Sequence, residues 1–362
     1  MSAGLEKALC AIHEKSYCHL VGNATSGIYL ALLALGLNGK VIAIPNSVCP
    51  HVPLAILLSG NIPLYLDISE EDLGLCILEL KRNIHKVDAV IAVHAYGSIC
   101  DVEAIASLCK LSNIPIIEDI AVAQGAKIDG RPVGSFSDIA VASFGAGKII
   151  DCGHGGALLT NDLALLNQAI VYEASFDEFR PSAKEALNTF SSFHTNLYNK
   201  FYGEKINSYC NLFKEKALAL RSKILYKFDY SYLNLIEQRL KYLDSIILSR
   251  MCKAERFREI FISSEIEIKA FTPKVGSVDW RFNFFIDNRD ALLKLLLTGE
   301  FKVSSWFPSV DLFFENREIS KIETNVSDRV GDRIINLWVN DDADTDYIQA
   351  VSKKIISYVG AK

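Results

Sequence analysis

Three short segments in the first half of the sequence carry side chains that could do chemistry together. Asp119 follows the apolar run I-P-I-I-E, and Lys148 ends the glycine-rich turn S-F-G-A-G-K, 29 residues later. The third segment, G-N-A-T-S-G, places Thr25 and Ser26 just before an apolar helical pattern. Each segment has a chemical interpretation beside an ordinary structural one.

The acidic pair Glu118 and Asp119 is predicted to stand at the carboxyl end of a buried strand, because the residues before it form a short apolar run. In parallel α/β sheets, ligands bind just outside this end of the strands. Aspartate is also a favoured N-cap of a following helix, so a purely structural role stays open.

Lys148 is a single lysine with apolar or small residues on both sides, I-A-V-A-S-F before the turn and I-I-D-C-G-H-G-G after it. Desolvation lowers the pKa of a lysine, and such an amine is a nucleophile that can form a Schiff base. The alternative is a lysine that extends from a loop to water. The turn lacks the spacing of a nucleotide phosphate-binding loop.

Thr25 and Ser26 stand where a helix is predicted to begin, so their hydroxyls and the free N–H groups there could bind an anion. Ordinary capping by Thr25 or Asn23 is the alternative. Taken together, the three segments suit pyridoxal phosphate (PLP). The phosphate would lie at the helix start, Asp119 would keep the pyridine nitrogen protonated, and Lys148 would hold the aldehyde as a Schiff base.

These segments lie within a pattern of short apolar runs that alternate with amphipathic helices. Such a pattern predicts an α/β fold whose mainly parallel sheet is covered on both faces. His94, at the end of one run, is predicted to be structural. The predicted strands are 41–44, 62–66, 88–94, 114–118, 139–144 and 156–160, and the predicted helices are 26–37, 54–59 and 102–111.

The second half of the chain differs in character. Residues 172–232 are rich in Tyr, Phe, Asn, Ser and Lys and are predicted to form a helical excursion from the first domain, 1–232. The second domain, 233–362, is predicted to begin with one long helix over 233–262 and to end in a small α+β unit. That unit would contain strands 280–286 and 333–339 and helices 289–297 and 346–359.

The composition excludes several classes of protein. The chain has 362 residues, half of them apolar, with a net charge of −5, which disfavours a general nucleic-acid binder. Mean hydropathy is +0.20, yet the apolar stretch 27–37 is too short to span a membrane. The N-terminus does not resemble a signal peptide. Nine scattered cysteines without a C-x-x-C pair, and histidines without metal-ligand spacing, predict a cytoplasmic protein with reduced thiols and no metal.

On longer segments the sequence resembles the DegT/DnrJ/StrS family of PLP-dependent sugar aminotransferases, of aspartate-aminotransferase fold type I. N-A-T-S-G-I-Y-L-A-L-L-A-L-G-L is similar to the family's G-T-x-A-L-x-L-A-L helix, and V-H-A-Y-G-S-I-C-D-V-E-A-I to V-H-x-Y-G-x-x-x-D-x-x-x-I. The stretch from I-E-D-I-A-V-A-Q-G-A to G-G-A-L-L-T-N-D is similar to the segment that carries the family's cofactor residues.

The resemblance implies a large domain with a mainly parallel seven-stranded sheet and a smaller C-terminal α+β domain. It implies that Lys148 is the Schiff-base lysine, since relatives with histidine there are dehydratases, and that Asp119 pairs with the pyridinium nitrogen. Ser143 and the Thr25–Ser26 turn would bind phosphate. Gln124 would be a further cofactor contact. His154, before the paired glycines, and Trp306, in W-F-P where the family has H-Y-P, would be substrate contacts.

The same resemblance implies a function. The chain would be an enzyme that moves an amino group from glutamate to a keto-sugar, with the acceptor linked to a nucleotide, for lipopolysaccharide or polysaccharide biosynthesis. It would act as a cytoplasmic homodimer with sites at the subunit interface. Two alternatives stay open: a PLP-fold protein without transaminase activity, which binds a ligand or regulates, and a PLP enzyme of another reaction type.

Several positions depart from the family pattern. The glutamine expected three residues after the aspartate is Val122, and Gln124 takes the place of the usual histidine. The aromatic residue that would stack on the cofactor ring is absent, and Val48 or His51 stands nearest. The family's N-Y-R-M motif is reduced to L-Y-K-F at 225–228. These departures point to a less typical acceptor.

Overall fold

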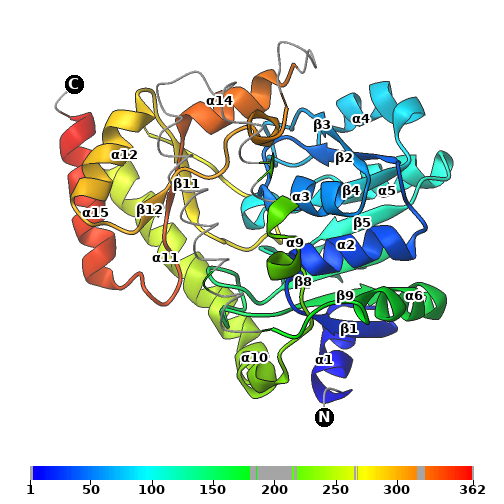
Figure 1. The fold of residues 1–362 in the computed structure, drawn as a ribbon. Coiled ribbons are helices and arrows are strands. Elements are labelled where there is room, and N and C mark those ends of the chain that lie inside the picture. Colours follow the sequence, from blue (N-terminus) through cyan, green and yellow to red (C-terminus); the bar gives the residue numbers. More distant parts are fainter. Residues whose placement is uncertain are drawn as a thin grey trace.

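A computed structural model describes residues 3–179, 185, 214–215, 218–264, 266, 268–315 and 323–360. Most of the predicted excursion 172–232 therefore lies outside the described residues. Within them, two β-sheets and the helices that cover these sheets form the fold (Figure 1).

The larger sheet has seven strands in the spatial order β1-β9-β8-β5-β4-β2-β3. Strands β3, β2, β4, β5 and β8 run parallel to their neighbours within this group, whereas β9 is antiparallel to both β8 and β1. This arrangement confirms the predicted mainly parallel sheet. The strands are β1 (Tyr17–Val21), β2 (Val41–Pro45), β3 (Ile62–Leu66), β4 (Ala89–Val93), β5 (Ile116–Asp119), β8 (Ile139–Ser143) and β9 (Gly156–Thr160).

Both faces of this sheet are buried because successive side chains of each strand point to opposite sides. On β2, Ile42 and Ile44 pack with helices on one face, while Ala43 packs with helices on the other. The first group of helices is α2 (Ala24–Ala34), α3 (His51–Leu58) and α6 (Leu163–Glu173); the second includes α4 (Ile77–Asn83) and α5 (Val102–Leu111).

The first strand and the helix before it were not predicted from the sequence. Helix α1 (Ala3–His13) buries Leu5 and Leu9, and β1 pairs with β9 along its whole length, from Tyr17 opposite Thr160 to Val21 opposite Gly156. The strand is short and carries a histidine, so its apolar signal is weak. Its place in the sheet depends on β9, which lies far away in the sequence.

The second sheet has four antiparallel strands in the order β10-β11-β13-β12. Together with its helices it forms the predicted smaller C-terminal domain, and Phe257, Phe282 and Phe284 are among the residues of its core. Its elements are β10 (Lys269–Ala270), β11 (Phe282–Phe285), α12 (Arg289–Thr298), β12 (Val303–Ser304), α14 (Asn325–Arg333), β13 (Ile334–Leu337) and α15 (Thr345–Val359).

The prediction of one helix over 233–262 is wrong. The chain forms α10 (Leu233–Lys241) and α11 (Leu243–Ser263), which are separated at Tyr242. Ile236 and Leu240 of α10 and Leu243 at the start of α11 join the core that includes α1, whereas Phe257 and Phe261 farther along α11 join the core of the second sheet. Figure 1 shows α10 beside α1 near the N-terminus and α11 running from there to the C-terminal helices.

Shorter elements complete the described chain. They are α9 (Arg221–Ile224), the two-stranded sheet of β6 (Lys127–Ile128) and β7 (Arg131–Pro132), and single 3-10 turns at Ile84–Lys86, Ala95–Gly97, Tyr230–Tyr232 and Val310–Phe313. Among the helices of the described ranges, none combines the length and the apolar character that crossing a membrane requires.

Gly22, which precedes α2, offers a test of how closely the chain packs at this point. A Cβ added there would lie 2.1 Å from the carbonyl oxygen of Tyr226, a backbone atom that cannot move aside. We expect Gly22→Ala to lower the free energy of unfolding by about 1–3 kcal/mol or more. Thermal unfolding measures this loss. Gly4→Ala is the control, since its Cβ would meet only the flexible end of Glu237; equal effects of the two changes would contradict the packing argument.

Candidate functional site

The carboxyl ends of the central parallel strands meet at one edge of the large sheet. Val93 at the end of β4 lies opposite Asp119 at the end of β5, and Asp119 lies opposite Val141 of β8. Strand β8 ends two residues later at Ser143, and the turn with Lys148 follows it. The fold therefore places Asp119, Ser143 and Lys148 at the same edge, as the sequence predicts.

Asp119 is only 6% exposed. Its Oδ1 accepts a hydrogen bond of 2.9 Å from the backbone N–H of Ala121. Burial raises the pKa of this carboxyl group, while the positive charge of Lys148 and the Ala121 N–H act in the opposite direction. Lys148 is thus near enough to stabilise the ionised carboxylate. Oδ2 is the oxygen that a protonated ring nitrogen could approach.

The turn that carries Lys148 is held through its main chain. Gly147 has φ of 75°, a conformation that favours glycine. Its carbonyl accepts a 2.6 Å hydrogen bond from the indole nitrogen of Trp280, and the carbonyl of Lys148 accepts one of 3.0 Å from Arg250. The half-buried lysine side chain has no ion-pair partner among the described residues, so its amine is available for chemistry.

At the start of α2, the cap and the two hydroxyls have separate roles. Asn23 is the N-cap, because its Oδ1 accepts a 2.8 Å hydrogen bond from the Ser26 N–H. Thr25 Oγ1 lies 3.2 Å from His51 Nδ1, and the buried Ser26 Oγ has no hydrogen-bond partner in the part of the chain that the structure describes. Asn23 therefore caps the helix, and the hydroxyl groups of Thr25 and Ser26 take no part in the cap.

Two residues near Lys148 come from the chain after β2: His51, which the sequence analysis named only as a residue near the missing aromatic position, and Cys49, which it did not name as part of a site. Burial and the nearby positive charge of Lys148 lower the pKa of His51 to about 4. Burial raises the pKa of the Cys49 thiol, and Lys148 again acts on it, in the opposite direction. The loop after β2 thus lies against the lysine and the start of α2. The missing aromatic residue in this part of the sequence indicated His51, whereas no motif indicated Cys49.

Gln124 is fully buried below the lysine turn. Its Nε2 donates a 2.8 Å hydrogen bond to the Ser143 carbonyl, and its Oε1 has no hydrogen-bond partner. In this position Gln124 fixes the end of β8. The Ser143 hydroxyl lies 3.4 Å from the Gly145 N–H, at the mouth of the turn.

The two predicted substrate contacts lie in different surroundings. His154 is buried among the rings of Phe179, Tyr226, Phe228 and Tyr232. Its Nε2 accepts a hydrogen bond from the Asp229 N–H, and burial lowers its pKa to about 4, so it is neutral at neutral pH.

Trp306 enters from the C-terminal domain and is partly buried against both cores of the large sheet. Asn336 holds its main chain: Oδ1 accepts from the Trp306 N–H at 2.7 Å, and Nδ2 donates to the Trp306 carbonyl at 3.0 Å. Next to it, the Phe307 N–H donates to the Tyr96 hydroxyl of the large domain. This segment therefore connects the two domains beside the strand ends.

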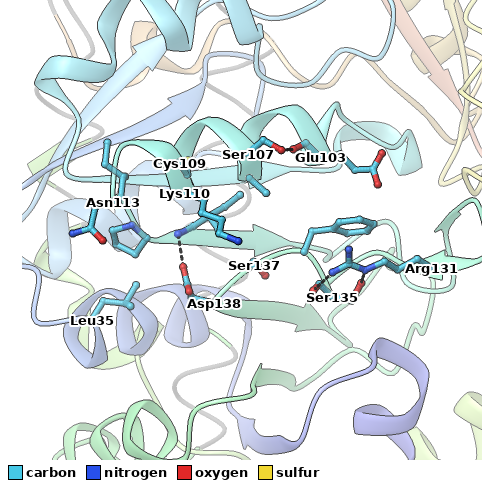
Figure 2. A pocket seen from close by; sticks show the side chains of 15 residues that line it. Leu35, Glu103, Ser107, Cys109, Lys110, Asn113, Arg131, Ser135, Ser137 and Asp138 are labelled. Atoms are coloured by element: carbon cyan, nitrogen blue, oxygen red, sulfur yellow. Dashed lines mark hydrogen bonds between the residues drawn. The ribbon is translucent and has the colours of Figure 1, made fainter.

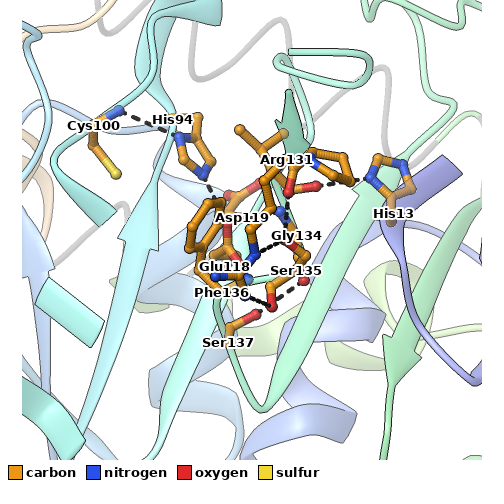
Figure 3. Close-up of polar contacts among 12 residues, drawn as sticks. His13, His94, Cys100, Glu118, Asp119, Arg131, Gly134, Ser135, Phe136 and Ser137 are labelled. Carbon is orange, nitrogen blue, oxygen red and sulfur yellow. Dashed lines mark hydrogen bonds and ion pairs between the residues drawn. The ribbon is translucent and has the colours of Figure 1, made fainter. Parts of the chain in front are cut away.

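Directly before Asp119, Glu118 forms a buried polar network (Figure 3). Its carboxylate accepts hydrogen bonds from the N–H groups of Gly134 (2.7 Å) and Phe136 (2.9 Å) and from His94 Nε2 (3.1 Å). The Cys100 N–H donates to the other ring nitrogen of His94, so Nε2 carries the ring proton. The network fixes the end of β5, which agrees with the structural role predicted for His94.

A large surface pocket lies elsewhere. Figure 2 shows Lys110, Arg131 and Asp138 among the residues that line it. Ile116 and Asp138 stand at the beginnings of β5 and β8, so this pocket lies at the opposite edge of the sheet from Asp119. Within the described ranges, no group of three or more His, Cys, Asp or Glu residues could hold a metal ion.

Comparison with known proteins agrees with this arrangement. A family model described as the DegT/DnrJ/EryC1/StrS aminotransferase family matches residues 2–194. GDP-perosamine synthase from Escherichia coli O157:H7 is 36% identical over 159 residues, which cover 43% of this chain and 44% of that protein. A dTDP-4-amino-4,6-dideoxy-D-glucose transaminase from Shigella dysenteriae is 33% identical over 162 residues, or 44% of each chain. The chain thus matches less than half the length of these relatives.

Solved structures match over almost the whole chain. Helicobacter pylori PseC, an aminotransferase involved in the biosynthesis of pseudoaminic acid, has a TM-score of 0.79 at 18% identity and covers 100% of this chain and 91% of its own. Bacillus subtilis NtdA, solved with bound PMP, has a TM-score of 0.76 at 20% identity, with coverage of 99% and 77%. These likenesses confirm the predicted fold.

The Glu118 network should make stability depend on pH. Burial alone would raise the pKa of Glu118, but His94 and the Gly134 N–H outweigh it, so the pKa lies below the ordinary 4.5. The stabilisation is complete above the unfolded pKa and is lost as the pH falls through the lower folded pKa. We expect Glu118→Gln to cost about 2–4 kcal/mol at pH 7 and to flatten the decline of melting temperature in acid. The exposed Glu103→Gln is the control; an unchanged melting temperature for Glu118→Gln would contradict this role.

Proposed function

Because the chain belongs to the DegT/DnrJ/EryC1/StrS aminotransferase family, we propose that it is a PLP-dependent aminotransferase that transfers an amino group from an amino-acid donor to a keto-sugar. The observation that carries the proposal is the joint position of Asp119, Lys148 and the start of α2 at one edge of the sheet. A carboxyl group, an amine and a helix start with free N–H groups lie at this edge, and they suit the pyridine nitrogen, the aldehyde and the phosphate of PLP.

The residues at this edge fit PLP. The first turn of α2 offers free N–H groups and the unpartnered Ser26 hydroxyl to a phosphate, with Thr25 and Ser143 nearby. Asp119 offers a buried carboxylate oxygen to the pyridine nitrogen, and Lys148 offers an amine to the aldehyde. When bound, PLP supplies an electron sink for the carbon that exchanges its proton.

Asp119 and Lys148 would control the charges in this reaction. Asp119 would keep a proton on the ring nitrogen, because its ionised form is stabilised by the Ala121 N–H and by the lysine. Lys148 would anchor the cofactor and, once its amine is free, carry a proton between the substrate carbon and the cofactor. Trp280 and Arg250 hold the backbone of the turn, so the Lys148 side chain can move while its Cα stays fixed.

His51 would cover the cofactor pocket where relatives have an aromatic ring. Its low pKa keeps the imidazole neutral at working pH, so it adds no charge near the lysine. Its contact with Thr25 connects the pocket cover to the phosphate end. The role of Gln124 would be to position Ser143. A substrate contact through His154 stays a prediction.

The substrate class follows from the relatives. Two of them are named for GDP- and dTDP-linked sugars, which supports a nucleotide-linked keto-sugar as acceptor, for polysaccharide or lipopolysaccharide synthesis. Trp306, held beside the site by Asn336, offers an aromatic face to a sugar ring. Glutamate is the proposed donor. The scattered cysteines support a cytoplasmic location.

A homodimer is also part of the proposal. Leu235, Tyr242, Leu248 and Met251 on α10 and α11 are exposed in the single chain, with exposed fractions of 43–63%. Large apolar side chains gathered on one pair of helices are typical of an interface. Light scattering should give twice the chain mass of 40.1 kDa, and a fully active monomer would contradict this part of the proposal.

The central test uses the visible absorption of the purified protein with PLP. We expect a yellow band that bleaches when glutamate is added and returns with 2-oxoglutarate. Lys148→Ala should abolish this cycle, with a loss of turnover of at least about a thousandfold, and leave the melting temperature nearly unchanged. Lys110→Ala, at the opposite edge of the sheet, is the control.

Two outcomes would contradict the proposal. A PLP band that no amino donor changes would favour another PLP reaction, and the absence of a band after incubation with PLP would favour a protein without transaminase activity. Retained amino transfer in Lys148→Ala would refute the role of that lysine.

A further inference from the structure

Asn46 is a buried amide at the point where β2 ends and the C-terminal domain meets the large sheet. It directly follows Pro45, the last residue of β2, and is 0% exposed. Its backbone N–H donates a 2.8 Å hydrogen bond to the Leu66 carbonyl at the end of β3, and its carbonyl accepts one of 2.7 Å from the Val310 N–H. The backbone of Asn46 therefore joins the sheet to a segment of the C-terminal domain.

The side chain of Asn46 uses its amide fully on that domain. Nδ2 donates to Asp311 Oδ1 at 2.7 Å and to the Thr324 hydroxyl at 2.8 Å, and Oδ1 accepts from the Asp311 N–H at 3.0 Å. A backbone N–H can only donate, so it fixes the orientation of the amide. Both partner residues are buried as well. Because a buried polar group that loses its partners lowers stability, these bonds hold the segment in one position.

The hydrogen bonds continue from here toward Trp306. Ser47 Oγ lies 3.0 Å from the Tyr96 hydroxyl, which accepts a 2.8 Å hydrogen bond from the Phe307 N–H. Asn336 holds the main chain of Trp306 from β13. Asn336 therefore fixes Trp306 within its own domain, whereas the residues after β2 fix the segment 306–311 against the large domain.

The chain after Asn46 also borders the proposed cofactor site. Burial raises the pKa of the Cys49 thiol, and the charge of the nearby Lys148 opposes this effect. His51 contacts Thr25 at the start of α2. A stretch of six residues thus binds the segment 306–311 at its beginning and lies beside the lysine and the phosphate end of the site at its end.

The C-terminal domain contacts this edge of the sheet through two separate sets of hydrogen bonds. Trp280 and Arg250 bind the carbonyls of the lysine turn, whereas Asn46 binds Asp311 and Thr324. Loss of the second set leaves the first in place. The anchor of the cofactor and the position of Trp306 can therefore be changed separately.

We propose that Asn46 is a positioning residue for the keto-sugar acceptor. It fixes the segment that carries Trp306 against the cofactor edge and so sets the affinity for the sugar, without a part in the reaction of the amino donor. This inference rests on the proposed function, in which Trp306 faces the sugar ring. An amide suits the task because it donates and accepts hydrogen bonds at once and carries no charge.

The test exchanges the hydrogen-bond roles of two residues. Asn46→Asp keeps the shape of the side chain but places a second carboxyl group against Asp311, where like charges repel. The double change Asn46→Asp with Asp311→Asn puts a donor opposite an acceptor again, and the Thr324 hydroxyl can donate instead of accept. The double change should therefore restore what the single change removes.

Asn61→Asp is the matched control. Asn61 is also buried, at 3% exposed, and both its amide atoms are hydrogen-bonded. All its side-chain partners belong to the large domain, and it precedes β3 at the opposite edge of the sheet. This change should lower stability without affecting Trp306.

The position of Trp306 is measured first, without any substrate. The three tryptophans of the chain are labelled with fluorine at ring position 5, and the NMR resonance of Trp306 is assigned with Trp306→Phe. We expect Asn46→Asp to shift or broaden this resonance, the double change to restore it, and Asn61→Asp to leave it unchanged. If Asn46→Asp fails to fold, Asn46→Ser is measured in its place. An unchanged resonance in the folded variant overturns the proposal, as does a double variant that fails to restore it.

The affinity for the sugar is measured second, with the yellow PLP band. An amino sugar that returns its amino group to the cofactor bleaches this band as glutamate does, so one form of the protein reports both affinities. The probes are GDP-perosamine and dTDP-4-amino-4,6-dideoxy-D-glucose, for which two relatives are named. We expect Asn46→Asp to raise the half-bleaching concentration of the sugar by about tenfold, and that of glutamate by less than about twofold.

The two measurements separate this inference from the proposed function. Equal losses for sugar and glutamate, or the same loss in Asn61→Asp, would indicate a general effect on the structure and overturn the role of Asn46. A wild type that glutamate bleaches and neither sugar bleaches would refute the sugar role of Asn46 and retain the transaminase. A Trp306 resonance that depends on Asn46, with no bleaching by any donor, would retain the positioning and refute the transaminase.

Discussion

The burial of an ionisable carboxyl group at the edge where the parallel strands end is the constraint on which the candidate site depends. Asp119 and Lys148 follow adjacent parallel strands, β5 and β8, whose carboxyl ends meet at one edge of the sheet. Burial raises the pKa of Asp119, and the positive charge of Lys148 reduces that effect without cancelling it. A pair of this kind persists only where the surrounding backbone is fixed. The Glu118 network at the end of β5 and the Gln124 contact at the end of β8 provide that rigidity.

The second domain completes the site through backbone atoms of the first. Trp280 and Arg250 bind the carbonyls of the lysine turn, and the segment around Trp306 is fixed by Asn336 on one side and by Tyr96 on the other. Contacts to main-chain carbonyls set the position of a turn without using the side chain that does the chemistry. This division leaves the lysine amine free while its attachment point is held by two domains.

Much of this arrangement could be predicted from the sequence because its signals are local. Apolar runs that end in an acid, or in a glycine turn with one lysine, indicate strand ends, and these placed Asp119 and Lys148 correctly. Features that depend on distant partners could not be predicted in this way. The break at Tyr242 separates α10 from a helix that begins on the same core and continues to the core of the second sheet, and β1 is defined by its pairing with β9. The sequence left Val48 and His51 as alternatives at the missing aromatic position, and the contact between His51 and Thr25 depends on the packing of α3 against α2.

The distribution of buried charge distinguishes residues that maintain the fold from those that await a ligand. Glu118 has its hydrogen-bond partners within the protein, so its charge is already compensated and its role is structural. Among the described residues, the buried Ser26 hydroxyl lacks such a partner. It lies at the start of α2, which follows β1 at the edge where the parallel strands end. Since an uncompensated buried group lowers stability, the fold retains such groups where a bound molecule supplies the missing partner.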